Sequence, residues 1–229
     1  MATSKLMLRG SIAATALAFL GGFAGSAQAG PQFSGWIPST ATGLAGGCPI
    51  ESRNGNKLFV AGGFEGSLDI FYYRRTGRAA TFGDRTKVDD PVSKPPTADG
   101  DVLDFCPTPL PGNALLFVST RAGGCGGSDI YASYFNPGRN TWSEPRNLGC
   151  APDGPNTAGF ELSPSVVETA AGTLLYFSTG PGIGQGQDIY ESRMRLDGSF
   201  GPGMAVMELN TPGAVHDRPP TGGRNGPRN

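Results

Sequence analysis

The sequence predicts an all-β fold, a β-propeller of four-stranded antiparallel blades. Its apolar residues come in short runs separated by Gly, Pro, Asn and Asp, a pattern typical of many short strands joined by turns. The 37 glycines and 20 prolines make up about a quarter of the chain, but clustered aromatic and β-branched residues argue against disorder. A unit of about 60 residues also recurs three times, and its four expected strands match the blade of a propeller.

The first 29 residues are expected to be a signal peptide rather than part of the fold. Lys5 and Arg9 form a positive start, residues 11–25 are mostly apolar, and Ala27-Gln28-Ala29 is a small-x-small cleavage pattern. The apolar stretch is shorter than the ~20 residues of a membrane-spanning helix, and no cysteine directly follows the cleavage site, so no stable membrane anchor is expected. We therefore expect cleavage near Ala29 and a periplasmic or secreted mature chain.

The charge balance gives no reason to expect a nucleic acid partner. Without Lys5 and Arg9, 16 basic residues face 19 acidic residues, so the mature chain carries a net charge of −3. No basic run is long enough to follow a phosphate backbone.

Three Asp-Ile-aromatic triplets mark the repeat, and their aspartates are 60 and then 59 residues apart. A proline and then an apolar run precede each triplet, and a further aromatic residue follows it. This order predicts three blades, at about residues 46–90, 104–149 and 161–210. The landmarks are the prolines Pro49, Pro107 and Pro164, the apolar runs 57–60, 115–118 and 174–177, the triplets 69–71, 129–131 and 188–190, and the aromatics Phe82, Trp142 and Phe200.

Each unit is expected to contain four strands in chain order. The first begins near the proline, and the second is the apolar run, whose nearly continuous hydrophobicity predicts burial on both faces. The third begins at the triplet, and the fourth is marked by the late aromatic residue.

The middle unit also carries a recognisable motif. Residues 117–131 read Phe-Val-Ser-Thr-Arg-Ala-Gly-Gly-Cys-Gly-Gly-Ser-Asp-Ile-Tyr, and residues 142–149 read Trp-Ser-Glu-Pro-Arg-Asn-Leu-Gly. This pattern resembles the TolB-like, WD-repeat-like β-propeller repeat of bacterial exported proteins. The third unit lacks the Ser-x-Arg element, and the first has no Trp in its motif. The resemblance covers about residues 46–221 and implies a propeller fold and export, but no particular activity.

Asp69, Asp129 and Asp188 hold one position in each unit and are candidate site residues. One carboxylate per blade would lie far from the next around a ring, so the three cannot share a metal ion. We expect each to accept backbone N–H bonds within its own loop, as in an Asx turn, and Trp142 to be a structural landmark of the repeat. No metal or cofactor is expected.

No catalytic residue is expected either. The only histidine, His216, lies beyond the last complete blade, and the glycine clusters 123–127 and 182–186 lack the Lys-Ser/Thr of a phosphate loop and predict tight hairpin loops with positive φ. A carboxylate pair for glycosidic hydrolysis remains an alternative, because sequence spacing does not give distances across a ring. Two of the four candidates precede a blade proline by three residues, which favours a structural role for them; the four are Asp99, Asp101, Asp104 and Glu161.

The four cysteines of an exported chain predict two disulfides. Cys125 lies between the second and third strands and Cys150 follows the fourth, and those two connections emerge on the same face of an up-and-down blade. Cys125 is therefore expected to pair with Cys150. Cys48 and Cys106 stand directly before equivalent prolines and are paired by default.

The propeller, at residues 30–221, is expected to be an incomplete ring. Residues 35–38 resemble a fourth strand without strands one to three before it, and residues 216–219 resemble the start of a further first strand. Residues 222–229 contain no strand former and are expected to be disordered. Three blades are fewer than the four to eight of closed propellers, so unpaired faces and self-association are expected.

The expected function is that of an exported, non-catalytic β-propeller scaffold or binding module. Its ligand would be a protein, a small molecule or a saccharide at the top face of the propeller. Two alternatives remain: a propeller-fold hydrolase of the glycosidase or lactonase kind, and a truncated fragment without function.

Overall fold

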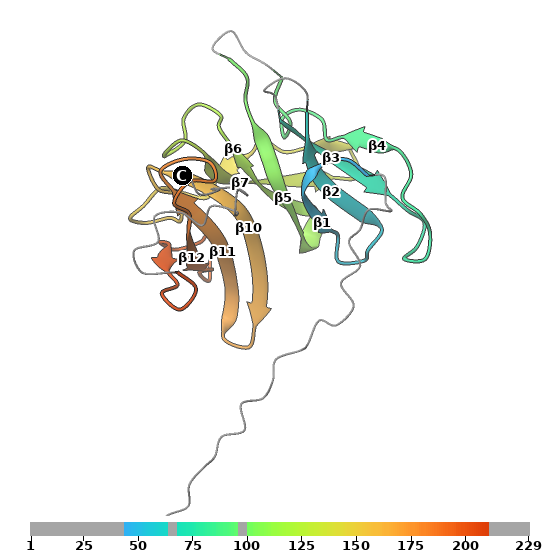
Figure 1. Cartoon of the computed structure of the whole chain (residues 1–229). Coiled ribbons are helices and arrows are strands. Elements are labelled where there is room, and N and C mark those ends of the chain that lie inside the picture. Colours follow the sequence, from blue (N-terminus) through green and yellow to red (C-terminus); the bar gives the residue numbers. More distant parts are fainter. Residues whose placement is uncertain (1–43, 64–67, 96–99, 211–229) are drawn as a thin grey trace, which may run out of the picture. The chain divides into compact units, whose positions relative to one another are not determined.

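The computed structural model describes residues 44–63, 68–95 and 100–210 of the chain, and this part is all-β. It forms three antiparallel sheets, in which the strands pair in chain order apart from one short extra strand in the second sheet (Figure 1). The only helical element assigned in these ranges is a single 3-10 turn, and no helix there is long and apolar enough to cross a membrane. The expected signal peptide, the strand at 35–38, Asp99, His216 and the C-terminal tail lie outside the described residues.

The strands of the three sheets have the following bounds. The first sheet contains β1 (Gly47–Glu51), β2 (Lys57–Gly62), β3 (Asp69–Arg74) and β4 (Arg85–Lys87). The second contains β5 (Asp104–Leu110), the 3-10 turn η1 (Pro111–Asn113), β6 (Ala114–Ser119), β7 (Asp129–Asn136), β8 (Thr141–Trp142) and β9 (Arg146–Asn147). The third contains β10 (Phe160–Thr169), β11 (Gly172–Gly180), β12 (Asp188–Arg193) and β13 (Met204–Ala205).

The position expected for the fourth strand needs a correction in two of the three sheets. Phe82 and Phe200 do not lie in the fourth strand but precede it, because β4 begins at Arg85 and β13 at Met204. In the second sheet Trp142 lies in the short strand β8, and β9 follows it as a second partner of β7. In the first and third sheets, the late aromatic residue therefore lies in the connection that precedes the outer strand.

The strand registers show which residues are equivalent in the three sheets. The inner hairpin ends with the pairs Gly62↔Asp69, Ser119↔Asp129 and Thr179↔Asp188, so its loop differs in length from sheet to sheet. As a consequence, the counterparts of Phe117 are Val60 and Phe177. The apolar runs aligned by sequence alone are thus offset by one residue in the first and third units.

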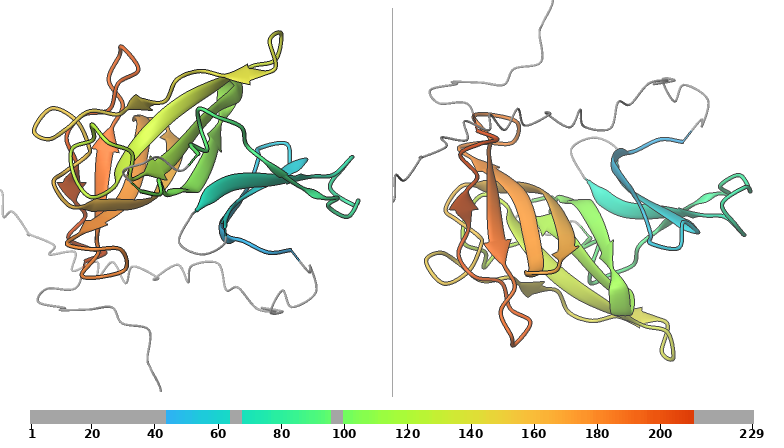
Figure 2. Two further views of the ribbon diagram at one scale, coloured as in Figure 1. Left: turned by 90° about the horizontal axis from the view of Figure 1, so that it is seen from above. Right: turned by 90° about the horizontal axis from the view of Figure 1, so that it is seen from below.

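The core lies between neighbouring sheets. One cluster joins Phe59, Ile70, Val88 and Val92 of the first unit to Leu115, Phe117 and Tyr131 of the second sheet. A second cluster joins Leu116, Ile130 and Ala132 of the second sheet to Leu175, Phe177 and Phe200 of the third unit. The second sheet lies between the other two (Figure 2) and buries alternate residues of β6 on opposite faces, which explains the continuous apolar run 115–118.

A bulge recurs in the first strand of every sheet, next to the blade proline. The register shifts between Gly47 and Ile50, between Phe105 and Thr108, and between Leu162 and Ser165. The residue before each proline has positive φ: 45° at Cys48, 45° at Cys106 and 51° at Ser163. We call these three residues the bulge series.

The bulge series brings the first strands of neighbouring sheets together. A disulfide joins Cys48 to Cys106 and so connects the first sheet to the second. The Cys106 sulfur lies 3.8 Å from the Ser163 hydroxyl oxygen, and the Thr108 hydroxyl donates a hydrogen bond to the Pro164 carbonyl. The three bulges therefore lie next to one another in chain order.

The second disulfide joins Cys125 to Cys150, the pairing that the sequence analysis predicts. It lies in the loop of the glycine cluster 123–127, where only Gly123 has positive φ. Gly126 is needed for another reason, since a Cβ there would lie 2.5 Å from the carbonyl oxygens of Thr157 and Gly159. Close backbone approach, more than backbone conformation, explains this cluster.

Candidate ligand-binding cleft

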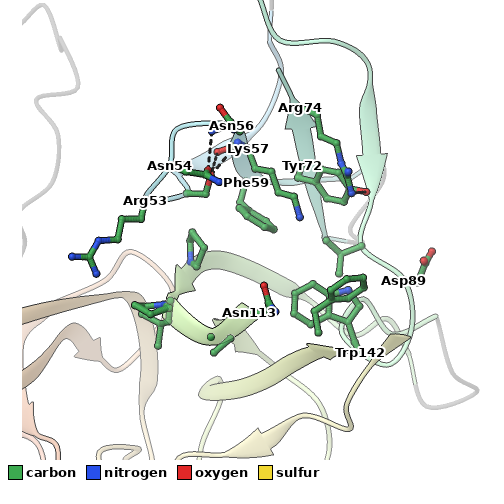
Figure 3. Close-up of a pocket in the computed structure, with 18 of the residues that line it drawn as sticks. Arg53, Asn54, Asn56, Lys57, Phe59, Tyr72, Arg74, Asp89, Asn113 and Trp142 are labelled. Atoms are coloured by element: carbon green, nitrogen blue, oxygen red, sulfur yellow. Dashed lines mark hydrogen bonds between the residues drawn. The ribbon is translucent and has the colours of Figure 1, made fainter. Parts of the chain in front are cut away.

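A cleft of about 630 Å³ lies between the first and second sheets. Its volume is within the range of ~300–1,000 Å³ that is typical of small-molecule sites. Residues of the first sheet form one wall, and residues of η1, β7 and β8 form the other (Figure 3). The lining includes five cations, four aromatic rings and a single carboxylate: Arg53, Lys57, Arg74, Arg75, Lys87, Phe59, Tyr72, Phe135, Trp142 and Asp89.

Lys57 and Arg74 form the centre of the first wall. They are directly opposite each other in the β2–β3 register, and both cations lie over the ring of Tyr72. The Lys57 Nζ is 5.2 Å and the Arg74 Cζ is 4.9 Å from the Tyr72 ring centroid. Arg74 also donates a hydrogen bond of 3.2 Å to the Tyr72 hydroxyl.

The environment of Lys57 disfavours its charge. Burial lowers the pKa of the Lys57 ammonium, and the positive charge of Arg74 lowers it further. Like charges that face each other across two strands repel, so this pair destabilises the sheet that carries it. Arg74 is exposed, which keeps the repulsion moderate because water screens it.

The other cations of the cleft differ from this pair because each has a carboxylate partner. Arg75 lies 3.0 Å from Glu51, Lys87 lies 2.7 Å from Asp69, and the exposed Arg53 lies 3.7 Å from Glu168. Within the described ranges, no carboxylate forms an ion pair with Lys57 or Arg74. The centre of the cleft wall therefore carries two positive charges that this part of the chain does not neutralise.

The second wall supplies aromatic and amide groups. Trp142 is half-buried, packs against the core cluster of Phe59 and lies 5.3 Å from the ring centroid of Phe135. Asn113 and Asn140 lie in turns with positive φ, 61° and 53°, which present their side chains at the cleft. Asn113 and Trp142 face Lys57 and Tyr72 across the cleft in Figure 3.

The three aspartates of the Asp-Ile-aromatic triplets lie in different environments. Asp129 is buried, and its Oδ2 accepts the Cys125 backbone N–H at 2.7 Å, a bond within its own loop whose donor precedes the aspartate by four residues and so differs from an Asx turn. Asp69 instead forms the ion pair with Lys87, and Asp188 is exposed. Among the described residues Asp129 holds its own loop by a backbone hydrogen bond, and most of the loop before Asp69, residues 64–67, lies outside the described ranges.

The carboxylates considered for hydrolysis that lie in the described ranges, Asp101, Asp104 and Glu161, do not form an accessible pair. Asp104 and Glu161 are both 0% exposed, and Asp101 is exposed on its own. Asp104 forms an ion pair of 2.8 Å with Arg121, and Glu161 accepts hydrogen bonds from the hydroxyls of Thr157 and Thr179. Burial raises the pKa of both acids. Fully buried carboxylates cannot reach a substrate, so the geometry gives them structural roles.

One repeated structural device was not predicted from the sequence. In each unit, a polar side chain after the outer strand bonds both the N–H and the C=O of the triplet isoleucine. The pairs are Ser93 with Ile70, Asn156 with Ile130 and Asn210 with Ile189. We call these three residues the bracket residues. Their distance from the triplet varies between units, which hides the repeat from an ungapped alignment.

The Lys57–Arg74 pair was also missed, although the sequence contains a signal for it. The equivalent register pairs are Ala114↔Tyr134 in the second sheet and Leu174↔Arg193 in the third. A blade does not need two cations there, so the pair is a departure from the repeat. The sequence alignment shifted the apolar run of the second unit by one residue relative to the other two, so it did not match Lys57 with its true counterpart there, Ala114.

The described residues hold no group of three or more His, Cys, Asp or Glu side chains that could bind a metal ion. No protein-family model and no curated protein matches the chain. The TolB-like resemblance therefore depends on the repeat motif alone.

Proposed function

We propose that the chain is an exported, non-catalytic binding module built from β-propeller blades, and that the cleft between the first two sheets holds its ligand. The single observation that carries the binding role is the lining of the cleft, which combines aromatic rings with charged and amide groups. Small-molecule sites typically combine an apolar wall with a few polar groups of this kind.

Several features support the propeller interpretation. Each sheet is antiparallel with its strands in chain order, neighbouring sheets bury apolar residues against each other, and the bulge series recurs in every first strand. These are features of stacked propeller blades. The motif at 117–131 and 142–149 supports membership of the TolB-like type of repeat.

The two disulfides indicate an oxidising compartment. The pattern of residues 1–29 supports export by a signal peptide cleaved near Ala29, to the periplasm or the cell exterior. A binding role fits these properties better than hydrolysis, because Asp104 and Glu161 are fully buried.

Mapping small probes onto the purified chain by NMR tests the binding role. A panel of neutral sugars, sugar acids, sugar phosphates, amino acids and nucleosides would be titrated against the ¹⁵N-labelled protein. We expect at least one probe class to shift the signals of cleft residues such as Tyr72, Asn113 and the Trp142 indole. A panel in which no probe shifts these signals, or in which every shift maps elsewhere, would contradict the proposed function.

A further inference from the structure

We propose that the cleft binds an acidic sugar, with Lys57 and Arg74 holding its carboxylate or phosphate group and the surrounding rings and amides holding its hydroxylated ring. This inference rests on the proposed function, since it assigns a ligand class to the same cleft. It depends on the arrangement of the two cations and on the polar groups around them.

Within the described ranges, Lys57 and Arg74 have no carboxylate beside them as an ion-pair partner. Lys57 and Arg74 face each other across β2 and β3 without an ion-pair partner in the described ranges, while the other three cations of the cleft have one. An oxyanion between them would accept charged hydrogen bonds from both, and such bonds are the strong ones in proteins. An anion between the two cations would also offset the repulsion of Lys57 by Arg74.

The second argument is that the blade does not require the pair. The equivalent positions hold Ala114 and Tyr134 in one sheet and Leu174 and Arg193 in the other, and both sheets pair in the same register. A stabilising cation–π role at Tyr72 would need only one cation. Two cations at this site are therefore better explained by a ligand than by stability.

The third argument concerns the rest of the ligand. Four asparagine side chains line the cleft: Asn54, Asn56, Asn113 and Asn140. The Asn54 oxygen accepts the Ser52 hydroxyl and the Asn56 N–H within its own turn, so the exposed amides of Asn113 and Asn140 are the ones offered to a ligand. Amides both donate and accept hydrogen bonds, which suits the adjacent hydroxyl groups of a sugar. Trp142 on the opposite wall offers an aromatic surface for the C–H face of the ring. A hydrophobic acid such as a fatty acid would place an apolar chain against the exposed amides of Asn113 and Asn140 and displace their water without replacing its hydrogen bonds.

The test compares four compounds by isothermal titration calorimetry on the purified chain: glucuronate, glucose 6-phosphate, glucose and inorganic phosphate. We expect at least one of the two acidic sugars to bind at least about tenfold more tightly than glucose and than inorganic phosphate. Glucuronate alone would identify a carboxylate ligand, and glucose 6-phosphate alone would identify a phosphate ligand.

Two variants and a matched control assign the effect to the pair. Lys57→Met and Arg74→Met remove one charge each and keep an apolar stem, and Arg146→Met removes an exposed cation of β9 that does not line the cleft. We expect the first two to weaken binding of the acidic sugar at least about tenfold and to leave glucose binding unchanged. Arg146→Met should bind like the wild type. Because they relieve repulsion, the two cleft variants should melt at or above the wild-type temperature.

The outcomes separate this inference from the proposed function. If glucose binds as tightly as the acidic sugars, or if Lys57→Met and Arg74→Met bind acidic sugar normally, the inference is wrong while the cleft remains a binding site. Inorganic phosphate binding as tightly as glucose 6-phosphate would also overturn it, because the sugar would then contribute nothing. If none of the four compounds binds, the inference fails, and the wider NMR panel decides whether the cleft binds anything else.

Discussion

Single residues of this chain illustrate how burial changes the role of an acid. Asp104, Asp129 and Glu161 are buried, and burial raises the pKa of each. Asp104 has Arg121 as a counter-ion, whereas Glu161 forms no ion pair in the described ranges and accepts hydrogen bonds from the Thr157 and Thr179 hydroxyls at its Oε1. The Oε2 of Glu161 is buried without a hydrogen-bond partner in the described part of the chain, which disfavours a negative charge on this side chain.

Glu161→Gln should therefore change how stability depends on pH. The folded pKa of Glu161 is raised above its unfolded value, so its contribution to stability is fully present below pH ~4.5 and is lost as pH rises through the folded pKa. Glutamine keeps an acceptor for the two threonine hydroxyls and does not ionise. We expect the unfolding free energy of the variant, relative to the wild type, to rise with pH above ~4.5, by at most ~1.4 kcal/mol per pH unit.

Urea denaturation at several values between pH 4 and 8 measures this difference. Glu168→Gln is the matched control, because Glu168 is exposed on the same strand and the substitution removes the same charge. A Glu161→Gln variant whose stability follows the wild type in parallel across this range would show that Glu161 is not held in its neutral form by the fold.

At the scale of the strand, each bracket residue bonds the backbone of the isoleucine near the start of the third strand of its sheet. Asn156 donates to the Ile130 carbonyl and accepts the Ile130 N–H, and its amide also donates to Asn147. It is 0% exposed, so water cannot replace these bonds. Asn210 makes the same two bonds to Ile189 in a half-buried position.

Replacing the bracket asparagines should give unequal losses of stability. Asn156→Ala leaves the buried N–H of Ile130 without its acceptor, while the Ile130 carbonyl still accepts the Leu148 N–H at 3.1 Å, so we expect a loss of about 1–3 kcal/mol. Asn210→Ala should cost about 1 kcal/mol, because its site is open to water. Chemical denaturation of both variants checks the order, and equal losses would contradict the role of burial.

The comparison of sequence with structure is most informative at this scale. The three strand-rich units, the doubly buried run 115–118 and the Cys125–Cys150 pairing could all be predicted, because short apolar runs and blade connectivity are local features. The bracket residues and the Lys57–Arg74 pair could not. Both depend on which residues lie opposite each other in neighbouring strands. The loop between Gly62 and Asp69 differs in length from the loop between Ser119 and Asp129, so an alignment without gaps does not reveal these equivalent positions.

In the whole described part of the chain, one disulfide lies within a unit and the other connects two sheets. Cys125–Cys150 closes a segment within the second unit, with a sequence separation of 25. Cys48–Cys106 has a separation of 58 and connects two sheets. The first sheet also contacts the second through two core clusters, one that contains Phe59 and Phe117 and one that contains Ala61, Phe105 and Val118.

Removing each bond by a double Cys→Ala change should therefore have different consequences. In the chain-entropy model the losses are about 3.5 kcal/mol for Cys125–Cys150 and about 4 kcal/mol for Cys48–Cys106. We also expect loss of Cys48–Cys106 to uncouple the first sheet, so that thermal unfolding broadens or separates into two transitions. Calorimetry of the two double variants tests this, and a single sharp transition in both would show that the core clusters alone couple the sheets.

The bulge series also limits how many of its three positions can be cysteine. A sulfur can bond only one other sulfur, yet the three bulges present equivalent positions in a row, with Cys106 in the middle. A third cysteine at this series would offer Cys106 two neighbours during oxidative folding, and one of the two products would leave the first sheet untethered. Ser163 occupies that position without a thiol, 3.8 Å from the Cys106 sulfur. The repeat thus has a serine hydroxyl at Ser163, where a cysteine would allow Cys106 to form either of two disulfides.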